Sequence, residues 1–439
     1  MKRTVLLAEC VAVCALACAL VTGCVSLNVK KPAPPAPPAV GTPEVGQAGL
    51  ADFDPLVATD FSDGLGVLGF DLRDPKKISL AIRRPADSKN WNQSPIGTGA
   101  LVPAAATNIG QVQVVVGSLP IAGPPGSPEK PFVAVSTPES GGEFVVTDVS
   151  QSLMGGRSTQ VTSLARTGGA DASDAQFIMV GATSASQNGE VGNPTNTLPF
   201  AFTSSDGRSW QRAGELPLPG GTTGADAMAV TFAPGGTAYP GVVAVGTAWT
   251  DEPKRRVIGV VWHSADQGKT WKVVSGEDFD QPDRSFLVQF VAADATTIVA
   301  AGAGVTAGEN SVAGQYGAID WTISSDGTVD RQIDTLDSNR NSVTTALIAR
   351  PNGGFLTATQ MFDLGSSQTR PGTTPQGNPK AYAWSATTGS DWINQTSSLG
   401  MDNAIVIPGI GENGGRVAFY GLNQTEAPLA YIVDSSAVK

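Results

Sequence analysis

The residue types that could do chemistry meet in one stretch, SADQGKTW at residues 264–271, which directly follows His263, the only histidine of the chain. Serine, histidine and aspartate are the members of a hydrolase triad, in which the histidine takes a proton from the serine. The same stretch also suits a tight turn, because serine and aspartate oxygens accept hydrogen bonds from turn backbone and glycine supplies positive φ. The recurrence of the stretch favours the turn.

Three related stretches occur elsewhere: FTSSDGRSW at 202–210, WSATTGSDW at 384–392 and, as a weaker copy, RRPADSKNW at 83–91. Each copy lies between two strand-like apolar runs, so each is expected to join the strands of a hairpin. The terminal tryptophan is large enough to fill the space between neighbouring hairpins. We therefore predict a structural turn at each copy and assign no catalytic residue.

The stretch SADQGKTW fits the pattern S-x-D-x-G-x-T-W and resembles the Asp-box, or BNR repeat, of sialidase-like β-propellers. The residues that carry the resemblance are Ser264, Asp266, Gly268, Thr270 and Trp271, and in the shorter copy Asp206, Gly207 and Trp210. Thr388 replaces the aspartate of the third copy, and Ser88 replaces the glycine of the weak copy. The resemblance implies that the box is structural and lies away from any active site.

A sialidase would also carry an R-x-P motif, an arginine triad, an aspartate acid and a tyrosine–glutamate pair, as that resemblance implies. Arg83-Arg84-Pro85 matches R-x-P only formally, because it runs directly into the weak copy of the box. The other members cannot be assigned by motif. A propeller hosts many functions, so the resemblance alone does not predict this activity.

Apolar runs at a spacing of about 50 to 65 residues indicate the architecture. Seven second strands are expected at 66–69, 114–117, 177–181, 242–246, 298–302, 355–359 and 417–421, and seven third strands begin near 78, 132, 199, 259, 318, 381 and 429. The fold class is thus all-β, a β-propeller of four-stranded antiparallel blades. Seven blades are favoured and six are the alternative. The last blade lacks an outer strand, and residues 50–62 are expected to supply it.

The N-terminus predicts export. Lys2 and Arg3 precede an apolar run, as in a secretory signal, although Glu9 interrupts that run. The run ends in Val21-Thr22-Gly23-Cys24, which resembles the lipobox of bacterial lipoproteins and implies lipidation at Cys24. We expect a lipoprotein signal peptide at 1–23, a lipidated cysteine with a Pro-rich linker at 24–49, and a propeller domain at 50–439. An uncleaved membrane anchor is the alternative.

The net charge and the counts of cysteine and histidine limit the kinds of partner and cofactor that are expected. Removing residues 1–23 takes away two basic and one acidic residue, which leaves 26 basic and 38 acidic residues and a net charge of −12. This balance argues against nucleic acid and against electrostatic docking on anionic lipid, so the lipid anchor would provide the membrane contact. All four cysteines lie within residues 10–24, and with a single histidine no zinc site is expected. We expect no metal and no cofactor, and interpret the acidic stretches at 52–64 and 276–283 as solvated loops.

The connections between second and third strands are long, and strand alternation places all of them on the face opposite the boxes. Long loops on a rigid scaffold often carry function. The candidate binding face comprises Trp249, Lys254, Arg255, Arg256, Met361, Phe362 and Arg370. Local packing of the loops is the alternative interpretation for each residue.

These observations favour an extracytoplasmic, lipid-anchored propeller that binds an envelope protein as an accessory scaffold of the cell envelope. The alternative is a propeller that binds or hydrolyses glycan, which needs opposed carboxylates or an arginine cluster over the centre of the ring. Its candidate acids on the loop-bearing face are Glu190, Glu252, Glu309 and Asp363. Whether the chain is an enzyme stays open, and a binding role is favoured.

Overall fold

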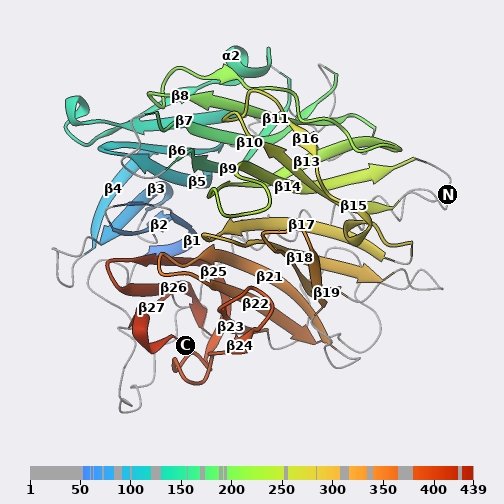
Figure 1. The fold of residues 1–439 in the computed structure, drawn as a ribbon. Helices are drawn as coiled ribbons and strands as arrows, with labels where there is room; N and C mark the ends of the chain where they lie inside the picture. The colour runs from blue at the N-terminus through green and yellow to red at the C-terminus, as the bar shows by residue number, and fades with distance from the viewer. Residues whose placement is uncertain are drawn as a thin grey trace, which may run out of the picture.

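The computed structural model describes residues 53–59, 61–62, 64–71, 74–83, 91–98, 101–119, 130–155, 157–168, 174–186, 191, 195–251, 256–282, 284–306, 316–333, 340–363, 379–423 and 428–438. They form seven antiparallel sheets arranged as the blades of a propeller (Figure 1). First strands of neighbouring blades contact one another, so they surround the centre of the ring. The predicted fold class and the preference for seven blades are confirmed.

The blades follow one another along the chain. Blade 1 contains β1 (Phe53–Thr59), β2 (Leu65–Asp71), β3 (Asp74–Arg83) and β4 (Asn92–Thr98); blade 2 contains β5 (Val102–Ile109), β6 (Val112–Leu119), β7 (Lys130–Ser136) and β8 (Phe144–Asp148). Blade 3 contains β9 (Thr159–Arg166), β10 (Phe177–Ser184), β11 (Thr197–Ser204) and β12 (Gln211–Arg212); blade 4 contains β13 (Thr222–Ala233), β14 (Gly241–Thr250), β15 (Val257–Ser264) and β16 (Lys272–Val273).

Blade 5 contains β17 (Arg284–Ala293), β18 (Ile298–Thr306), β19 (Tyr316–Ile323) and β20 (Val329–Ile333); blade 6 contains β21 (Arg340–Ala349), β22 (Phe355–Asp363), β23 (Lys380–Ala386) and β24 (Ile393–Asn394). Blade 7 has three described strands, β25 (Ala404–Asn413), β26 (Arg416–Asn423) and β27 (Pro428–Asp434). Short helices are α2 (Ser150–Met154), η2 (Pro138–Ser140), η3 (Glu277–Phe279) and η4 (Ser435–Ala437). No described helix combines the length and the apolar character needed to cross a bilayer.

Every run predicted as a second or third strand occupies that position in its blade. Val, Ile, Phe and Trp dominate these strands, which are buried on both faces because each blade packs between two others. The core is therefore divided among the interfaces between blades. Trp262, for example, lies in the cluster that joins blades 3 and 4, and Trp321 lies in the cluster that joins blades 4 and 5.

In six of the seven blades a recurrent glycine lets the second strand approach the first strand closely. In six blades the second strand carries a glycine opposite a bulge in the first strand, and a Cβ atom there would lie 1.8–2.1 Å from a first-strand carbonyl oxygen. The glycines are Gly69, Gly117, Gly181, Gly246, Gly302 and Gly421. Blade 6 has Thr359 at this position, where the hydroxyl accepts a hydrogen bond from Trp384 Nε1 at 3.0 Å. The glycine that ends six of the seven predicted second strands thus has a steric cause.

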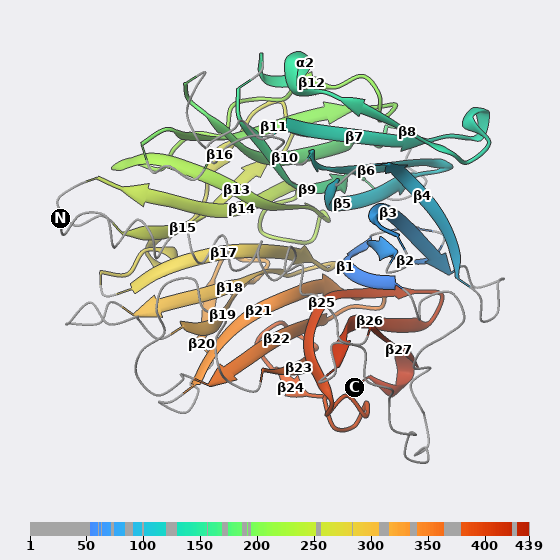
Figure 2. The same ribbon diagram turned by 180° about the vertical axis from the view of Figure 1, so that it is seen from behind.

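The prediction for ring closure was wrong. Residues 53–59 form β1 and pair with β2, so they are the innermost strand of blade 1 and add no outer strand to blade 7. The blue start of the described chain lies beside the red end in both ribbon views (Figures 1 and 2). Asn413 Nδ2 donates to Phe61 O and Ser62 O at 3.1 and 3.2 Å across this seam, and Trp91 packs edge-on against Tyr420.

Candidate functional site

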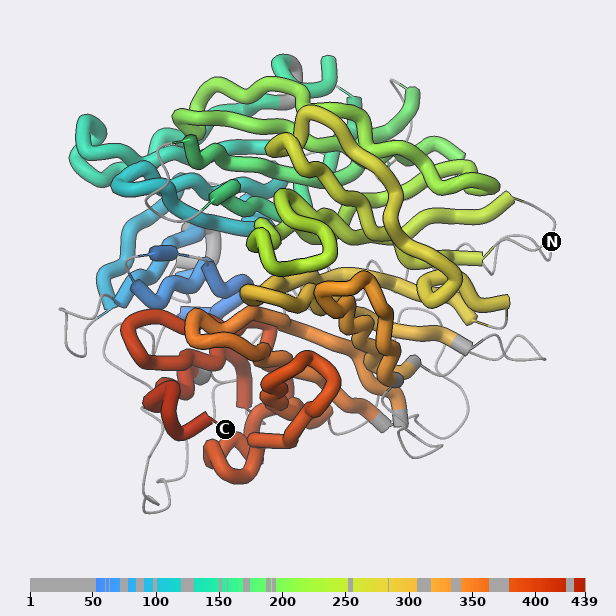
Figure 3. Tube along the Cα trace, in the orientation of Figure 1, coloured from blue at the N-terminus to red at the C-terminus, as the bar shows by residue number. Residues whose placement is uncertain are grey.

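Antiparallel blades give the ring two different ends. Turns between first and second strands and between third and fourth strands share one end, the turn face. Connections between second and third strands, and from one blade to the next, share the other end, the loop face. The tube shows how the described chain passes from one blade to the next (Figure 3). Any functional site must be assigned to one of these ends or to the centre.

On the turn face, the stretch at 264–271 is a turn closed by hydrogen bonds among its own residues. Ser264 Oγ accepts from Gly268 N and donates to Asp266 Oδ1, both at 2.8 Å. The Asp266 carboxylate also accepts from Thr270 N at 2.8 Å and from Thr270 Oγ1 at 2.7 Å. Burial raises the pKa of Asp266, but the hydrogen bonds from Thr270 and Ser264 outweigh it and lower the pKa to about 2. The carboxylate is thus held ionised within the turn.

The copy at 202–210 is built in the same way. Ser204 Oγ accepts from Gly207 N at 2.8 Å, and Asp206 accepts from Ser209 N at 2.7 Å. The pKa of Asp206 is raised by burial and lowered more by hydrogen bonds from Ser209, Arg208 and Ser204, with a result of about 2. Trp210 Nε1 donates to Gly207 O at 2.9 Å. All hydrogen-bonding groups named here serve the turn itself.

The copy at 384–392 reaches the same result with its aspartate at the other end. Asp391 Oδ1 accepts from Thr387 N, Thr388 N and Thr388 Oγ1 at 2.9, 2.8 and 2.9 Å. Sequence comparison identified Thr388 as a defect of the pattern, and it missed that Asp391 supplies the carboxylate. The signal was present, because Asp391 directly precedes the terminal tryptophan.

Each of these turns packs onto the preceding blade. The glycines Gly207, Gly268 and Gly389 have φ of 74°, 92° and 85°, and a Cβ atom on each would lie 2.5–3.0 Å from Val114, Ile178 and Val299 respectively. Trp271 packs in the cluster between blades 3 and 4, and Trp210 in the cluster between blades 2 and 3. The contacts agree with a structural role.

No triad forms around His263. Its Nε2 lies 2.8 Å from Pro240 O, its ring lies against Tyr239 at 5.6 Å, and Ser264 Oγ is engaged by Asp266 and Gly268. Within the described part of the chain, no group of three His, Cys, Asp or Glu residues is arranged to hold a metal ion. The turn face therefore presents no catalytic geometry among the described residues.

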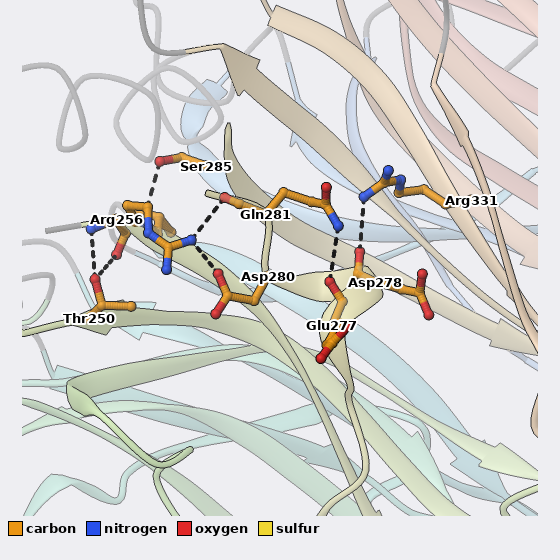
Figure 4. A network of polar contacts seen from close by, with 9 residues as sticks. Thr250, Arg256, Glu277, Asp278, Asp280, Gln281, Ser285 and Arg331 are labelled. Carbon is orange, nitrogen blue, oxygen red and sulfur yellow. Dashed lines mark hydrogen bonds and ion pairs between the residues drawn. The ribbon is translucent and has the colours of Figure 1, made fainter. Parts of the chain in front are cut away.

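On the loop face, a polar network joins blades 4 and 5 (Figure 4). Arg256 Nη1 is ion-paired with Asp280 and donates to Gln281 O at 2.8 Å, which ties the β14–β15 connection to the segment that leads into blade 5. Thr250 and Arg256 close the base of that connection, with Arg256 N donating to Thr250 Oγ1 at 2.9 Å. The contact shows that the two kinds of connection share this face in blade 4.

The network continues along η3. Trp321 Nε1 donates to Asp278 O at 2.9 Å, Arg331 Nη1 to the same oxygen at 3.4 Å, and Gln281 Nε2 to Glu277 O at 3.2 Å. The side chains of Glu277 and Asp278 are exposed. The backbone of this acidic segment is thus fixed from blade 5 while its carboxylates face solvent.

The candidate binding residues differ in how far their side chains are exposed. Trp249 and Met361 are only 5% and 9% exposed, and Trp249 packs with Val257 and Leu287. Both side chains are largely covered, which agrees with the alternative interpretation of local packing, so they offer little surface to a partner. Arg256 and Phe362 are half-buried. Lys254, Arg255, Arg370, Cys24, Glu190, Glu252 and Glu309 lie outside the described residues, as does the side chain of Asp363.

Two carboxyls near the centre were not anticipated. Asp54 in β1 and Asp226 in β13 hold equivalent positions, with their carbonyl oxygens against Gly69 and Gly246. Burial raises the pKa of both, and that of Asp226 to about 7. Asp226 is 6% exposed and lies opposite Thr247, and its Oδ1 atom has no hydrogen-bond partner within the described part of the chain. An aspartate within the apolar run GADAMAV was the overlooked signal.

Solved structures with a similar fold include three informative examples. A protein of unknown function from Dyadobacter fermentans has 13% identity and a TM-score of 0.43, with 88% of this chain and 95% of that chain covered. A Trypanosoma rangeli sialidase in complex with sialic acid has 10% identity and a TM-score of 0.46, with 90% and 59% covered. An α-L-arabinanase from Penicillium chrysogenum has 10% identity and a TM-score of 0.33, with 64% and 94% covered.

This chain therefore spans little more than half the length of that sialidase. No protein-family model matches the chain. No curated protein matches it either. The similarities concern the fold, and the class of protein that the described residues define is a seven-bladed β-propeller.

Proposed function

We propose that this chain is a lipid-anchored, extracytoplasmic propeller that binds a protein partner in the bacterial cell envelope through its loop face. The supporting observation is the asymmetry of the ring. Turns on the turn face, such as those at 110–111, 205–210 and 265–271, are short or closed by internal hydrogen bonds. The connections at 120–129, 307–315 and 364–379 are long in sequence, and the described strand ends that they join lie at the loop face. A rigid ring with long connections at one end suits recognition of a macromolecule.

Recognition at this end of the ring and along its outer rim would use exposed groups held on fixed backbone. An example on the rim is η3, where Glu277 and Asp278 project from a segment tied to Trp321 and Arg331. Immobilised backbone reduces the entropy lost on binding. The turns at 202–210, 264–271 and 384–392 are proposed to be Asp-boxes with a purely structural role.

The test of the binding face is crosslinking and pull-down from native membranes. Residues 364–378 are replaced by a short Gly-Ser segment, and the control replaces the exposed turn Ser325–Gly327 of the turn face in the same way. We expect a partner that is lost in the first variant and retained in the control. Equal capture by both variants would contradict a binding role for this part of the loop face.

The test of the anchor uses Cys24→Ser with Cys18→Ser as the matched control. Partitioning into a detergent phase is expected to be lost only in Cys24→Ser, because only Cys24 follows the small residues of the predicted lipobox. If both variants partition like the wild type, the lipid anchor is wrong.

A glycan-related activity is the second candidate, and the observation that favours it is the raised pKa of Asp54 and Asp226 near the centre. A carboxyl that keeps its proton near neutral pH can act as a general acid. The measurement is release of sugar from cell-wall polysaccharide by the wild type, Asp54→Asn and Asp226→Asn. If the wild type releases no sugar, the proposal that this chain hydrolyses glycan is wrong.

A further inference from the structure

Two Asn-Gly-Gly sequences occur in the described part of the chain, at 352–354 and 413–415. An asparagine before glycine is prone to deamidation, because glycine has no side chain to hinder attack by its own backbone nitrogen. A third Asn-Gly pair, at 188–189, lies outside the described residues. The two described copies share both following residues, so a difference in their reactivity would come mainly from the fold.

Deamidation exchanges two bonds and needs only water. The backbone nitrogen of the glycine bonds to Cγ of the asparagine while the Cγ–Nδ2 bond breaks. The glycine N–H proton passes through solvent to the leaving nitrogen, which departs as ammonia. Water then opens the five-membered imide and gives aspartate or isoaspartate. Because the side chain must first turn over the glycine nitrogen, any contact that holds the amide slows the reaction.

Asn352 lies in a turn on the turn face of blade 6. Pro351, Asn352 and Gly353 are exposed, and Gly353 N donates to Arg350 O at 3.0 Å. Within the described part of the chain, the side chain of Asn352 has no hydrogen-bond partner. This copy therefore serves as the reference for an Asn-Gly-Gly turn whose amide is not held.

Asn413 is the last residue of β25, and its amide is held at the seam between blades 7 and 1. Nδ2 donates to Phe61 O at 3.1 Å and to Ser62 O at 3.2 Å, both in the connection from β1 to β2. Gly414 and Gly415 have φ of 57° and 75°, as in the tight two-residue turn of a hairpin. Both hydrogen bonds must break before Cγ can reach the nitrogen of Gly414, so the reaction requires this contact to open.

The product cannot restore the contact. A carboxylate only accepts hydrogen bonds, so at position 413 it would face two carbonyl oxygens without a donor. Isoaspartate would also lengthen the backbone next to Glu412, whose ion pair of 3.0 Å with Arg350 joins blade 7 to blade 6. The reacting bond thus lies beside the contacts of blade 7 with both of its neighbours.

We propose that Asn413 is a site of spontaneous deamidation that reacts when the seam between blades 7 and 1 opens and then prevents the seam from closing again. The two blades fit closely near the centre, where a Cβ atom on Gly409 would lie 2.7 Å from Ala58 N. A small displacement of β25 therefore separates them. The proposal uses no partner and no lipid anchor, so it stands or falls separately from the proposed function.

The first experiment measures the reaction at both asparagines of the full chain at about pH 8, as the gain of one mass unit in peptides from a timed digest. In the chain unfolded by urea, we expect similar rates at Asn352 and Asn413. In the folded chain, Asn413 should react at least about tenfold more slowly than Asn352, as two hydrogen bonds of ordinary net strength would cause. Equal rates in the folded chain would overturn the coupling to the seam, and no reaction at Asn413 in either state would overturn the site.

The second experiment reads the seam by amide hydrogen exchange of residues 53–59 and 404–411 in Asn413→Asp. We expect exchange at least about tenfold faster than in the wild type, with β15 of blade 4 unchanged. Asn352→Asp adds the same charge at an exposed position and should change neither region. If Asn413→Asp does not fold, the fraction of wild-type protein deamidated at Asn413, separated by anion exchange, gives the same measurement. Unchanged exchange at the seam would overturn the proposal.

Discussion

Arg350 and Glu412 form an ion pair of 3.0 Å between blades 6 and 7, with side chains only 15% and 3% exposed. The same guanidinium donates to two backbone carbonyls of the segment after β27, so each of its three nitrogens donates a hydrogen bond within the protein. Removing one member leaves the other charge buried without its partner, which is costly. This pair joins the last two blades and fixes the end of the described chain.

We expect Arg350→Ala to lower the free energy of unfolding by about 3 kcal/mol, because Glu412 is then left unpaired in a nearly dry site. Urea denaturation followed by circular dichroism measures this. The matched control is Arg212→Ala, which breaks an ion pair with Glu215 whose side chains are 58% and 82% exposed. That substitution should change stability by less than about 0.5 kcal/mol. Equal effects of the two substitutions would refute the role of burial.

Gly246→Ala should prevent stable folding of the ring or cost several kcal/mol, because the new methyl group would lie 1.9 Å from the carbonyl oxygen of Asp226. Gly304→Ala is the control on a second strand, where the nearest atoms are 3.6 Å away. It should leave the midpoint of thermal unfolding within a few degrees of the wild type. A similar loss in both variants would show that the close approach is unimportant.

Asp226→Asn is expected to stabilise the protein in a pH-dependent manner. Burial raises the pKa of Asp226 to about 7, so the folded state keeps a proton that the unfolded state releases near pH 4. The free energy of unfolding of the wild type therefore falls as pH rises from about 4 to about 7 and stays low above it. The asparagine variant should be more stable at pH 8 by up to about 4 kcal/mol, and similar at pH 4.

Denaturation curves at pH 4, 6 and 8 measure this difference. The control Asp251→Asn changes an exposed aspartate directly after β14 and should change the free energy of unfolding by less than about 0.5 kcal/mol. If the advantage of Asp226→Asn is as large at pH 4 as at pH 8, ionisation is not its cause.

Gln267→Gly should raise the free energy of unfolding by about 0.5 to 1 kcal/mol. Gln267 has φ of 60° between Asp266 and Gly268, a conformation that costs a residue with a Cβ atom about 1 kcal/mol. The substitution also removes a hydrogen bond of 3.2 Å from Gln267 Nε2 to Asp174, which is exposed and contributes little. Ala265→Gly in the same turn is the control and should destabilise, because that residue does not need the freedom of glycine.

The sequence predicted the strands well because their period and composition are local properties. Apolar runs identified every second strand, and six of the seven runs end in glycine. The serine–aspartate–glycine spacing identified the turns at 204–210 and 264–271. The blade number followed from counting these runs. What the runs could not show was which neighbour each strand pairs with, so β1 was assigned to the wrong blade.

The candidate site was predicted less well. The distinction between turn face and loop face follows from strand direction alone, and the contact of Arg256 with Asp280 agrees with it. Whether a loop residue faces solvent depends on the adjacent blade, which is distant in sequence. Trp249 was a candidate for the binding face with local packing as the alternative, and it packs against Leu287 of the next blade. Asp226 was overlooked because its burial arises from three-dimensional packing.

The seam between Asn413 and Phe61 joins residues 352 positions apart in the chain. During synthesis the first six blades can stack in order, each on the one before it, while blade 1 keeps one apolar side uncovered. That side, with Phe53, Leu65 and Trp91, is covered only once β26 and β27 have been made. Contacts of such long range form slowly, so ring closure is expected to be the rate-limiting step of folding and the stage most exposed to aggregation.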